Sequence, residues 1–207
     1  MPLYKSIAAD DETHILIWKI TETENELSTG ISLGKNSTER VLGMKSEMHR
    51  KAYLSVRHLL AIAQYTDEDL TYNEVGKPKL SDGVCVSITH SHEFSAIILS
   101  AKPVGIDIEK QRIKIETIAN KFVSEKEKEW LSKHQNNIKS LTVIWGAKES
   151  IYKLYGQVGL SFKQHIELAP FNFKETFTRA SVHFKEEIEF FDVFYLEFEE
   201  FTCVYTF

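Results

Sequence analysis

Two acidic side chains, Asp107 and Glu109, stand two positions apart in a short apolar stretch of the chain. Successive side chains of a β-strand alternate between its faces, so both carboxylates project on one side while Ile106 and Ile108 project on the other, into a core. Carboxylates so placed repel each other, and a cation between them relieves that repulsion. Hard oxygen ligands suit Mg²⁺, which completes its coordination with water and substrate phosphate. The pattern therefore indicates a divalent-metal site.

A second charged segment, residues 145–153, has the pattern of a helix. Trp145, Glu149 and Lys153 lie at i, i+4 and i+8 and share one helix face, so Glu149 is expected to reach the same metal and Lys153 to point near it. Lys148 is rotated by about 100° from Glu149 and would flank the metal or cover an adjacent anion. A metal site beside a cationic helix is the combination that phosphate chemistry needs.

Each motif also has a purely structural interpretation. An Asp-x-Glu pair on a strand is ordinarily a solvated polar face, and Glu149 with Lys153 is also an ordinary helix-surface ion pair. Ser124 followed by Glu127 is a capping box, which satisfies backbone N–H groups at a helix start. Trp145 is explained most simply by core packing. The specificity of the prediction therefore comes from the combination of motifs.

That combination, Gly-Ile-Asp-x-Glu at 105–109 and Trp-x-x-Lys-Glu-Ser-x-x-Lys at 145–153, resembles the signature of the 4'-phosphopantetheinyl transferases, specifically the surfactin-synthetase-activating type. Three further matches follow the family's order: Gly-Lys-Pro at 76–78, Ser-Ile-Thr-His-Ser at 87–91 and Phe-Val-Ser-Glu-Lys-Glu at 122–127. The resemblance implies a holo-[acyl-carrier-protein] synthase type enzyme. Such an enzyme transfers 4'-phosphopantetheine from coenzyme A to a serine of an apo acyl or peptidyl carrier protein, depends on Mg²⁺ and releases 3',5'-adenosine bisphosphate.

The resemblance also implies roles for the charged residues of the two main motifs. Asp107, Glu109 and Glu149 would hold Mg²⁺, while Lys148 and Lys153 would neutralise the phosphates as catalytic residues. Glu149 is also the candidate to accept the serine proton, although a metal-bound carboxylate is a weak base. Lys121, Lys126 and Lys128 are candidate contacts to an acidic helix of the carrier protein.

Further contacts to coenzyme A are expected from basic and hydroxyl side chains. A basic run on the first long helix is usually a solvated face, but a guanidinium offers paired donors to the phosphates that coenzyme A carries. The resemblance implies that part of this run binds the 3'-phosphate, and that the Gly-Lys-Pro turn and the Ser-Ile-Thr-His-Ser strand end also contact the coenzyme. The candidates are Arg50, Lys51, Arg57, Lys77, Thr89 and His90. Thr89 stands where serine is commoner in the family, and it keeps the hydroxyl.

Composition limits the function classes. With 207 residues and 43% hydrophobic content, the chain can bury a core as one large domain or two small ones. A net charge of −5 argues against a general nucleic-acid binder. No apolar run approaches the roughly 18 residues that cross a bilayer, and no signal-peptide core is present, so a cytoplasmic protein is expected. Cys85 and Cys203 are predicted to be buried free thiols.

Periodicity predicts an α+β fold with several helices and strands. The expected helices cover residues 27–34, 46–65, 115–122, a segment opened by Ser124, and 138–155. The expected strands cover 15–20, 84–89, 95–100, 104–108, 166–168, 180–184, 190–198 and 201–207. The resemblance implies two similar α+β halves, 1–103 and 104–207, related by an approximate two-fold with the active site in the cleft between them. A monomer that is an internal pseudo-dimer is expected.

Two other function classes remain open at this level. A Mg²⁺-dependent diphosphate hydrolase would use the same carboxylates and lysines but would need no carrier protein. An inactive module that binds coenzyme A or a carrier protein is the third class. The intact set of Asp107, Glu109, Lys148, Glu149 and Lys153 argues against that third class.

Overall fold

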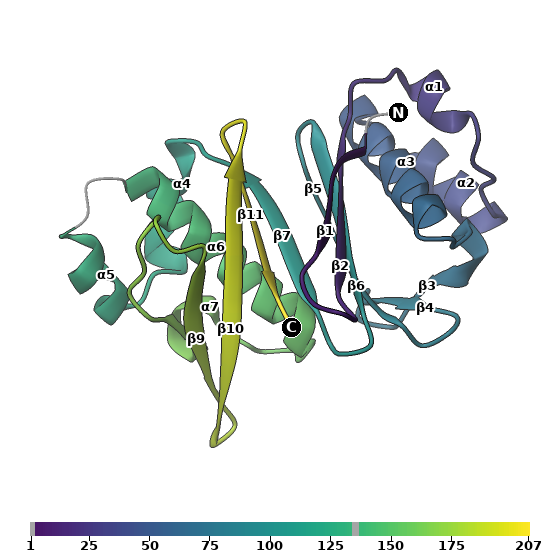
Figure 1. Cartoon of the computed structure of the whole chain (residues 1–207). Coiled ribbons are helices and arrows are strands. Elements are labelled where there is room, and N and C mark those ends of the chain that lie inside the picture. The colour runs from purple at the N-terminus through teal and green to yellow at the C-terminus, as the bar shows by residue number, and fades with distance from the viewer. Residues whose placement is uncertain (1–2, 134–136) are drawn as a thin grey trace. The chain divides into compact units, whose positions relative to one another are not determined.

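A computed structural model describes residues 3–133 and 137–207 of the chain (Figure 1). The chain divides into two compact units, Met1–Pro103 and Val104–Phe207. Each unit combines an antiparallel sheet with a long helix that contacts it. The predicted α+β class is confirmed, with the two main sheets in separate halves of the chain.

The first unit is built on a four-stranded antiparallel sheet in the order β1-β2-β6-β5. Its strands are β1 (Leu3–Ala8), β2 (His14–Lys19), β5 (Cys85–Ser91) and β6 (Phe94–Ser100). Helix α3 (Glu47–Ile62) contacts β2 and β6, and it begins where the Ser46 hydroxyl accepts a hydrogen bond from the His49 amide. Its apolar side chains pack with those of the sheet into one core.

Smaller elements complete the first unit. Helices α1 (Glu24–Ser28) and α2 (Lys35–Gly43) precede α3, and the short helix η1 (Asp67–Asp69) follows it. Strands β3 (Leu70–Tyr72) and β4 (Pro78–Leu80) form a two-stranded ladder around the Gly-Lys-Pro turn. Gly76 in that turn has φ +79°, a conformation that glycine adopts without strain.

The second unit is built on a five-stranded antiparallel sheet in the order β7-β11-β10-β9-β8. Its strands are β7 (Gly105–Lys110), β8 (Ile166–Leu168), β9 (Phe177–Phe184), β10 (Glu187–Phe198) and β11 (Phe201–Thr206). Helix α6 (Asn137–Tyr155) contacts β7, β11 and β10, as Figure 1 shows. The shorter helices are α4 (Lys114–Ile118), η2 (Ala119–Lys121), α5 (Glu125–Leu131) and α7 (Phe162–His165).

Several predicted local features of the helices and strands are confirmed. Ser124 and Glu127 form the predicted capping box of α5. Helix α6 ends at Tyr155, and Gly156 follows it with φ +66°. Strand β8 has the predicted bounds. Cys85 and Cys203 are free thiols as predicted, but only Cys203 is buried, whereas Cys85 is half-buried.

The predicted helix at residues 27–34 is wrong. Helix α1 lies earlier, because Thr23 and Glu26 form a capping box that starts it, and Gly30 follows its end with φ +82°. Strand β1, helix α2 and the β3–β4 ladder were not predicted. Among the described residues no helix is long and apolar enough to cross a membrane.

Candidate functional site

The predicted acidic and cationic residues meet where α6 crosses β7. Lys153 Nζ donates to Asp107 Oδ1 at 2.8 Å and to the Ile106 carbonyl at 2.9 Å. The Asp107 side chain is 8% exposed and that of Lys153 is 27% exposed, so their ion pair is partly shielded from water. Glu149 lies one turn before Lys153 on the same helix. The structure thus joins the two motifs at one helix–strand contact.

The carboxyl of Glu149 at this contact has a raised pKa. Burial raises the pKa of Glu149, the charges of Asp107 and Glu109 raise it further, and Lys153 partly opposes them, which leaves the pKa at about 7. The charges of Asp107 and Glu109 thus both oppose ionisation of Glu149. Repulsion of this kind was the reason to predict a cation at Asp107 and Glu109.

Asp107 is buried as well, although the strand pattern placed only Ile106 and Ile108 in a core. Asp107 pairs across the sheet with Val204, and a Cβ built on Gly146 of α6 would lie near both side chains, 3.8 Å from Asp107 Oδ2. Val204 belongs to the core beneath α6, whereas Ile106 and Ile108 are buried without being members of that core. Ile106 and Ile108 are thus buried as predicted, and the acidic face of β7 is the one that α6 covers.

The side chains at this contact have the oxygen donors that a divalent metal requires, but they are not spaced closely enough to form a metal site. Asp107, Glu109 and Glu149 offer only oxygen donors, and their mutual repulsion would fall if a cation bound between them. Within residues 3–133 and 137–207, however, no three Asp, Glu, His or Cys side chains are gathered closely enough to form a metal site. The contact therefore offers residues of the right kind for a divalent metal.

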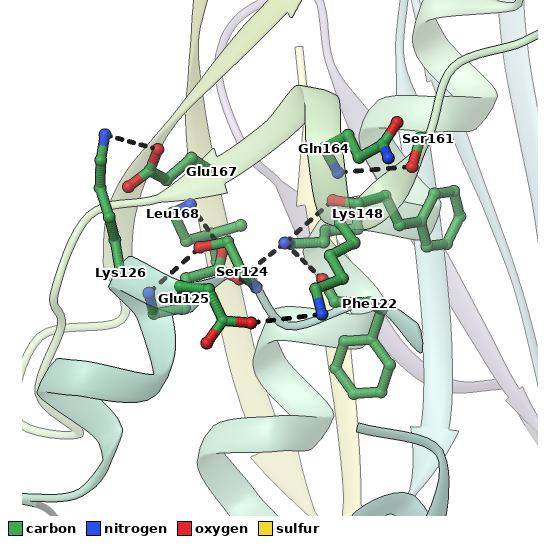
Figure 2. Close-up of polar contacts among 12 residues, drawn as sticks. Phe122, Ser124, Glu125, Lys126, Lys148, Ser161, Gln164, Glu167 and Leu168 are labelled. Carbon is green, nitrogen blue, oxygen red and sulfur yellow. Dashed lines mark hydrogen bonds and ion pairs between the residues drawn. The ribbon is translucent and has the colours of Figure 1, made fainter. Parts of the chain in front are cut away.

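Lys148 lies on another side of α6, and the predicted position beside the metal does not match its contacts. Its side chain is fully buried, and its ammonium donates to Glu127 at 2.7 Å and to the carbonyls of Phe122 at 2.7 Å and Phe162 at 3.1 Å (Figure 2). Burial lowers the pKa of Lys148, and Glu127 opposes this shift. All three partners of the ammonium are protein oxygens, so the structure explains Lys148 as an anchor of α6.

Glu127 completes this anchor from the first turn of α5. Besides accepting from Lys148, it accepts hydrogen bonds from the amides of Ser124 at 2.8 Å and Leu168 at 2.9 Å. The capping glutamate therefore joins α5, α6 and β8, as the contacts of Lys148 and Leu168 in Figure 2 illustrate. Sequence reasoning identified the cap but missed the ion pair.

Arg57, one of the predicted coenzyme-binding residues, forms a buried ion pair within the chain instead. Its guanidinium pairs with Asp67 at 2.8 Å, both side chains are only 4% exposed, and it lies 3.5 Å from the ring centroid of Tyr53. Asp67 in turn accepts from the Gly34 amide and the Ser37 hydroxyl. Arg57 therefore joins α2, α3 and η1, and binding a phosphate would require breaking this buried network.

Arg50 and Lys51 lie in the first turns of α3. Arg50 donates to Glu24 at 2.8 Å and to the Met44 carbonyl at 2.8 Å, and its side chain is 23% exposed. Lys51 is half-buried. Both side chains have some access to water and remain candidates for phosphate contact.

The other three candidates belong to β5 and the turn before β4. His90 is exposed at the end of β5, and its ring centroid lies 5.9 Å from that of His49 on α3. Thr89 is buried at 5% exposure. Lys77 is half-buried, and burial lowers the pKa of its ammonium, with Lys79 adding to the shift and Cys85 opposing it. The His49–His90 contact joins two segments that the sequence analysis had not paired.

Trp145 packs against the core of the second unit, as its structural interpretation predicted. Its ring contacts Phe122 edge-on with centroids 5.1 Å apart and Phe162 at 5.6 Å, beside the main core of the second unit.

The second unit thus presents carboxylates and a lysine at one contact between α6 and β7, and an aromatic core and the buried Lys148–Glu127 ion pair hold α6 in place. Such a site suits phosphate groups together with a divalent cation.

Comparison with known proteins agrees with this description. Residues 103–204 match the family model of the 4'-phosphopantetheinyl transferase superfamily. The chain is also 37% identical over 106 residues to the 4'-phosphopantetheinyl transferase gsp of Aneurinibacillus migulanus, an alignment that covers 49% of this chain and 44% of that protein. Both similarities agree with the predicted resemblance to the 4'-phosphopantetheinyl transferases, and the family match lies in the second half of the chain. The chain spans less than half the length of the curated relative it matches.

Proposed function

We propose that this protein transfers 4'-phosphopantetheine from coenzyme A to a serine of an apo acyl or peptidyl carrier protein, with release of 3',5'-adenosine bisphosphate. The observation that carries the proposal is the contact of Lys153 with Asp107 beside Glu149, inside the segment that matches the family. The reaction moves a phosphoryl group, so charge stabilisation and alignment supply most of the catalysis.

The chain's own residues divide this work. A Mg²⁺ bound by Asp107, Glu109 and Glu149 would offset the negative charge of the coenzyme's diphosphate. Lys153, already paired with Asp107, brings an ammonium to the same place and would neutralise a phosphate oxygen. Glu149 remains the candidate to hold the proton of the carrier serine. Lys148 holds α6 in place through Glu127 rather than meeting the phosphates.

Residues of the first unit enter the proposal as coenzyme contacts. Arg50, Lys51, Lys77 and His90 combine positive charge or an imidazole with partial or full exposure. We infer that Arg50 and Lys51 contact the 3'-phosphate. Arg57 and the buried Thr89 are weaker candidates, because their side chains are enclosed.

The partner would be a carrier protein that presents an acidic helix beside its modifiable serine. Lys126 and Lys128 of α5 are candidate contacts, with side chains 79% and 38% exposed and each paired with a glutamate of this chain. Lys121 is exposed as well. If all three contact the carrier protein, reversing their charges should raise the KM for carrier protein and leave the KM for coenzyme A unchanged.

Intact-mass spectrometry tests the proposal directly. Apo carrier protein, coenzyme A, Mg²⁺ and this protein would be incubated together, beside an Asp107→Asn control and a reaction with EDTA. We expect the carrier protein to gain the mass of one phosphopantetheine group in the complete reaction only.

Other outcomes identify the alternatives. Hydrolysis of coenzyme A without a change in carrier mass would support the diphosphate hydrolase. Binding of coenzyme A with no reaction on any of several fatty-acid, polyketide or peptide-synthetase carriers would support an inactive binding module. Either result would overturn the proposed transfer.

A further inference from the structure

Two glycines lie where α6 packs against the sheet. A Cβ built on Gly105 of β7 would lie 1.8 Å from the Ser150 carbonyl oxygen, and a Cβ built on Gly146 of α6 would lie 2.7 Å from Val204 Cγ2. Any larger side chain at Gly105 would have to move the helix backbone. The two glycines therefore allow α6 to lie against β7 and β11 at a depth that other residues would prevent.

Ser150 contacts the sheet at the same level. Its fully buried hydroxyl donates to the Val204 carbonyl of β11 at 2.9 Å and to the Gly146 carbonyl, one turn earlier in α6, at 2.7 Å. A hydroxyl has one proton to share between the two acceptors, so the geometry holds only while helix and strand keep this spacing. Ser150 thus meets β7 through its backbone and β11 through its side chain.

These contacts lie beside the charged residues of the candidate site. Val204 pairs across the sheet with Asp107, and Thr206 pairs with Gly105. Ser150 follows Glu149 directly and comes three residues before Lys153, which reaches Asp107 at 2.8 Å. Lifting or rotating α6 at Ser150 would therefore move Glu149 and Lys153 relative to the carboxylates of β7.

We propose that Ser150 is a positioning residue which, with Gly105 and Gly146, sets the depth of α6 so that Lys153 meets Asp107 and Glu149 lies on the same side of the helix. The proposal rests on the proposed function, because it concerns the same site. Ser150 itself touches no reacting group. Its effect should appear first in the assembly of the cation site and then in the reaction.

Binding of Mn²⁺ to Ser150→Ala tests this role without relying on activity. Calorimetric titration would compare the wild type with Ser150→Ala, which removes the hydroxyl and leaves the glycine contacts. We expect the affinity for Mn²⁺ to fall by about 10-fold or more, the size of effect typical of residues that orient metal ligands. Circular dichroism and thermal unfolding would confirm that the variant remains folded.

Helix α6 offers a matched control in Ser140→Ala. Ser140 is also buried, and its hydroxyl has no hydrogen-bond partner among the described residues. Its loss should leave the Mn²⁺ affinity at the wild-type value. A folded Ser150→Ala variant with wild-type affinity would overturn the inference, and so would a wild type that binds no Mn²⁺. A wild type that binds Mn²⁺ but transfers nothing would refute the transfer function alone.

A second pair of variants tests helix depth directly. Gly146→Ala should weaken Mn²⁺ binding, because its methyl group would meet the Val204 side chain. Adding Val204→Ala removes the two methyl carbons of valine and should restore part of the affinity. A double variant that binds no better than Gly146→Ala would contradict the positioning role.

Discussion

The buried ion pair between Lys148 and Glu127 makes a quantitative prediction about stability. Lys148→Met would keep most of the side-chain volume and remove the ammonium. Glu127 would then be a buried carboxylate without its cation, and the carbonyls of Phe122 and Phe162 would each lose a donor. All of these groups lie away from the Asp107 contact, so the loss should appear as a loss of fold stability.

The size of the loss follows from three terms. Removing one partner of a buried ion pair costs about 3–5 kcal/mol, and an unsatisfied buried acceptor costs about 1–3 kcal/mol. The amides of Ser124 and Leu168 still donate to Glu127 and offset part of the charge. The acceptor cost and the remaining amide hydrogen bonds act in opposite directions. We therefore expect Lys148→Met to lower the free energy of unfolding by about 4 kcal/mol, the middle of the ion-pair range. Combined with Glu127→Gln, it should cost at least about 1 kcal/mol less than the two single losses added together.

Urea unfolding would measure this change. Trp130 and Trp145 both lie in the second unit, so their fluorescence in a Trp18→Phe background reports on that unit. Lys126→Met is a matched control, because Lys126 pairs with Glu167 while 79% exposed and should contribute less than about 1 kcal/mol. If Lys148→Met costs no more than Lys126→Met, or if the double variant is simply additive, the anchoring role of Lys148 is refuted.

Three further changes have expected outcomes. Burial raises the pKa of Asp67, but hydrogen bonds from Arg57, Ser37 and the Gly34 amide outweigh it and hold that pKa below its usual value. This stabilisation is present above the unfolded pKa of about 4 and is lost as pH falls through the folded pKa, so Asp67→Asn should flatten the loss of stability in acid, measured by thermal unfolding. Glu199 and Glu200 connect β10 to β11 with φ 45° and 64°, so replacing them with Asn-Gly should raise the free energy of unfolding by about 1 kcal/mol, whereas Ala-Ala should not. Burial raises the pKa of Tyr195 to about 12, so ultraviolet titration should show one late-titrating tyrosine fewer in Tyr195→Phe. The same variant should lose about 1 kcal/mol with the hydrogen bond to the Asn172 carbonyl, and a stability equal to wild type would contradict the contact.

The elements that could be predicted from the sequence are those with strong local signals. Helix α6 has apolar residues at helical spacing and a glycine after its end, and α5 has a capping box before its first turn. Strand β7 was predicted from its short apolar run. The prediction of the metal-site residues Asp107, Glu109 and Glu149 came from the family resemblance together with strand alternation.

The elements that were missed lack such signals. Helix α2 buries only Ser37 and leaves Leu42 80% exposed, so it shows no apolar face. Strand β1 lies at the edge of its sheet with no fully buried residue. Strands β3 and β4 are three residues each, which is too short to show an alternating pattern, so only the turn between them was predicted. The partner of Lys148 was missed because a contact across 21 positions leaves no periodic trace in the sequence.

The Trp-x-x-Lys-Glu-Ser-x-x-Lys motif therefore combines two kinds of residue on one helix. Side chains one position apart point about 100° away from each other, so Lys148 turns toward Glu127 while Glu149 turns toward β7. Lys153, about one turn beyond Glu149, shares its side of the helix and meets Asp107. Ser150 holds the helix to β11 between them. The same nine positions thus supply both the chemistry and the placement of the helix that carries it, so loss of Lys148 should act through stability and loss of Ser150 through the affinity for a cation.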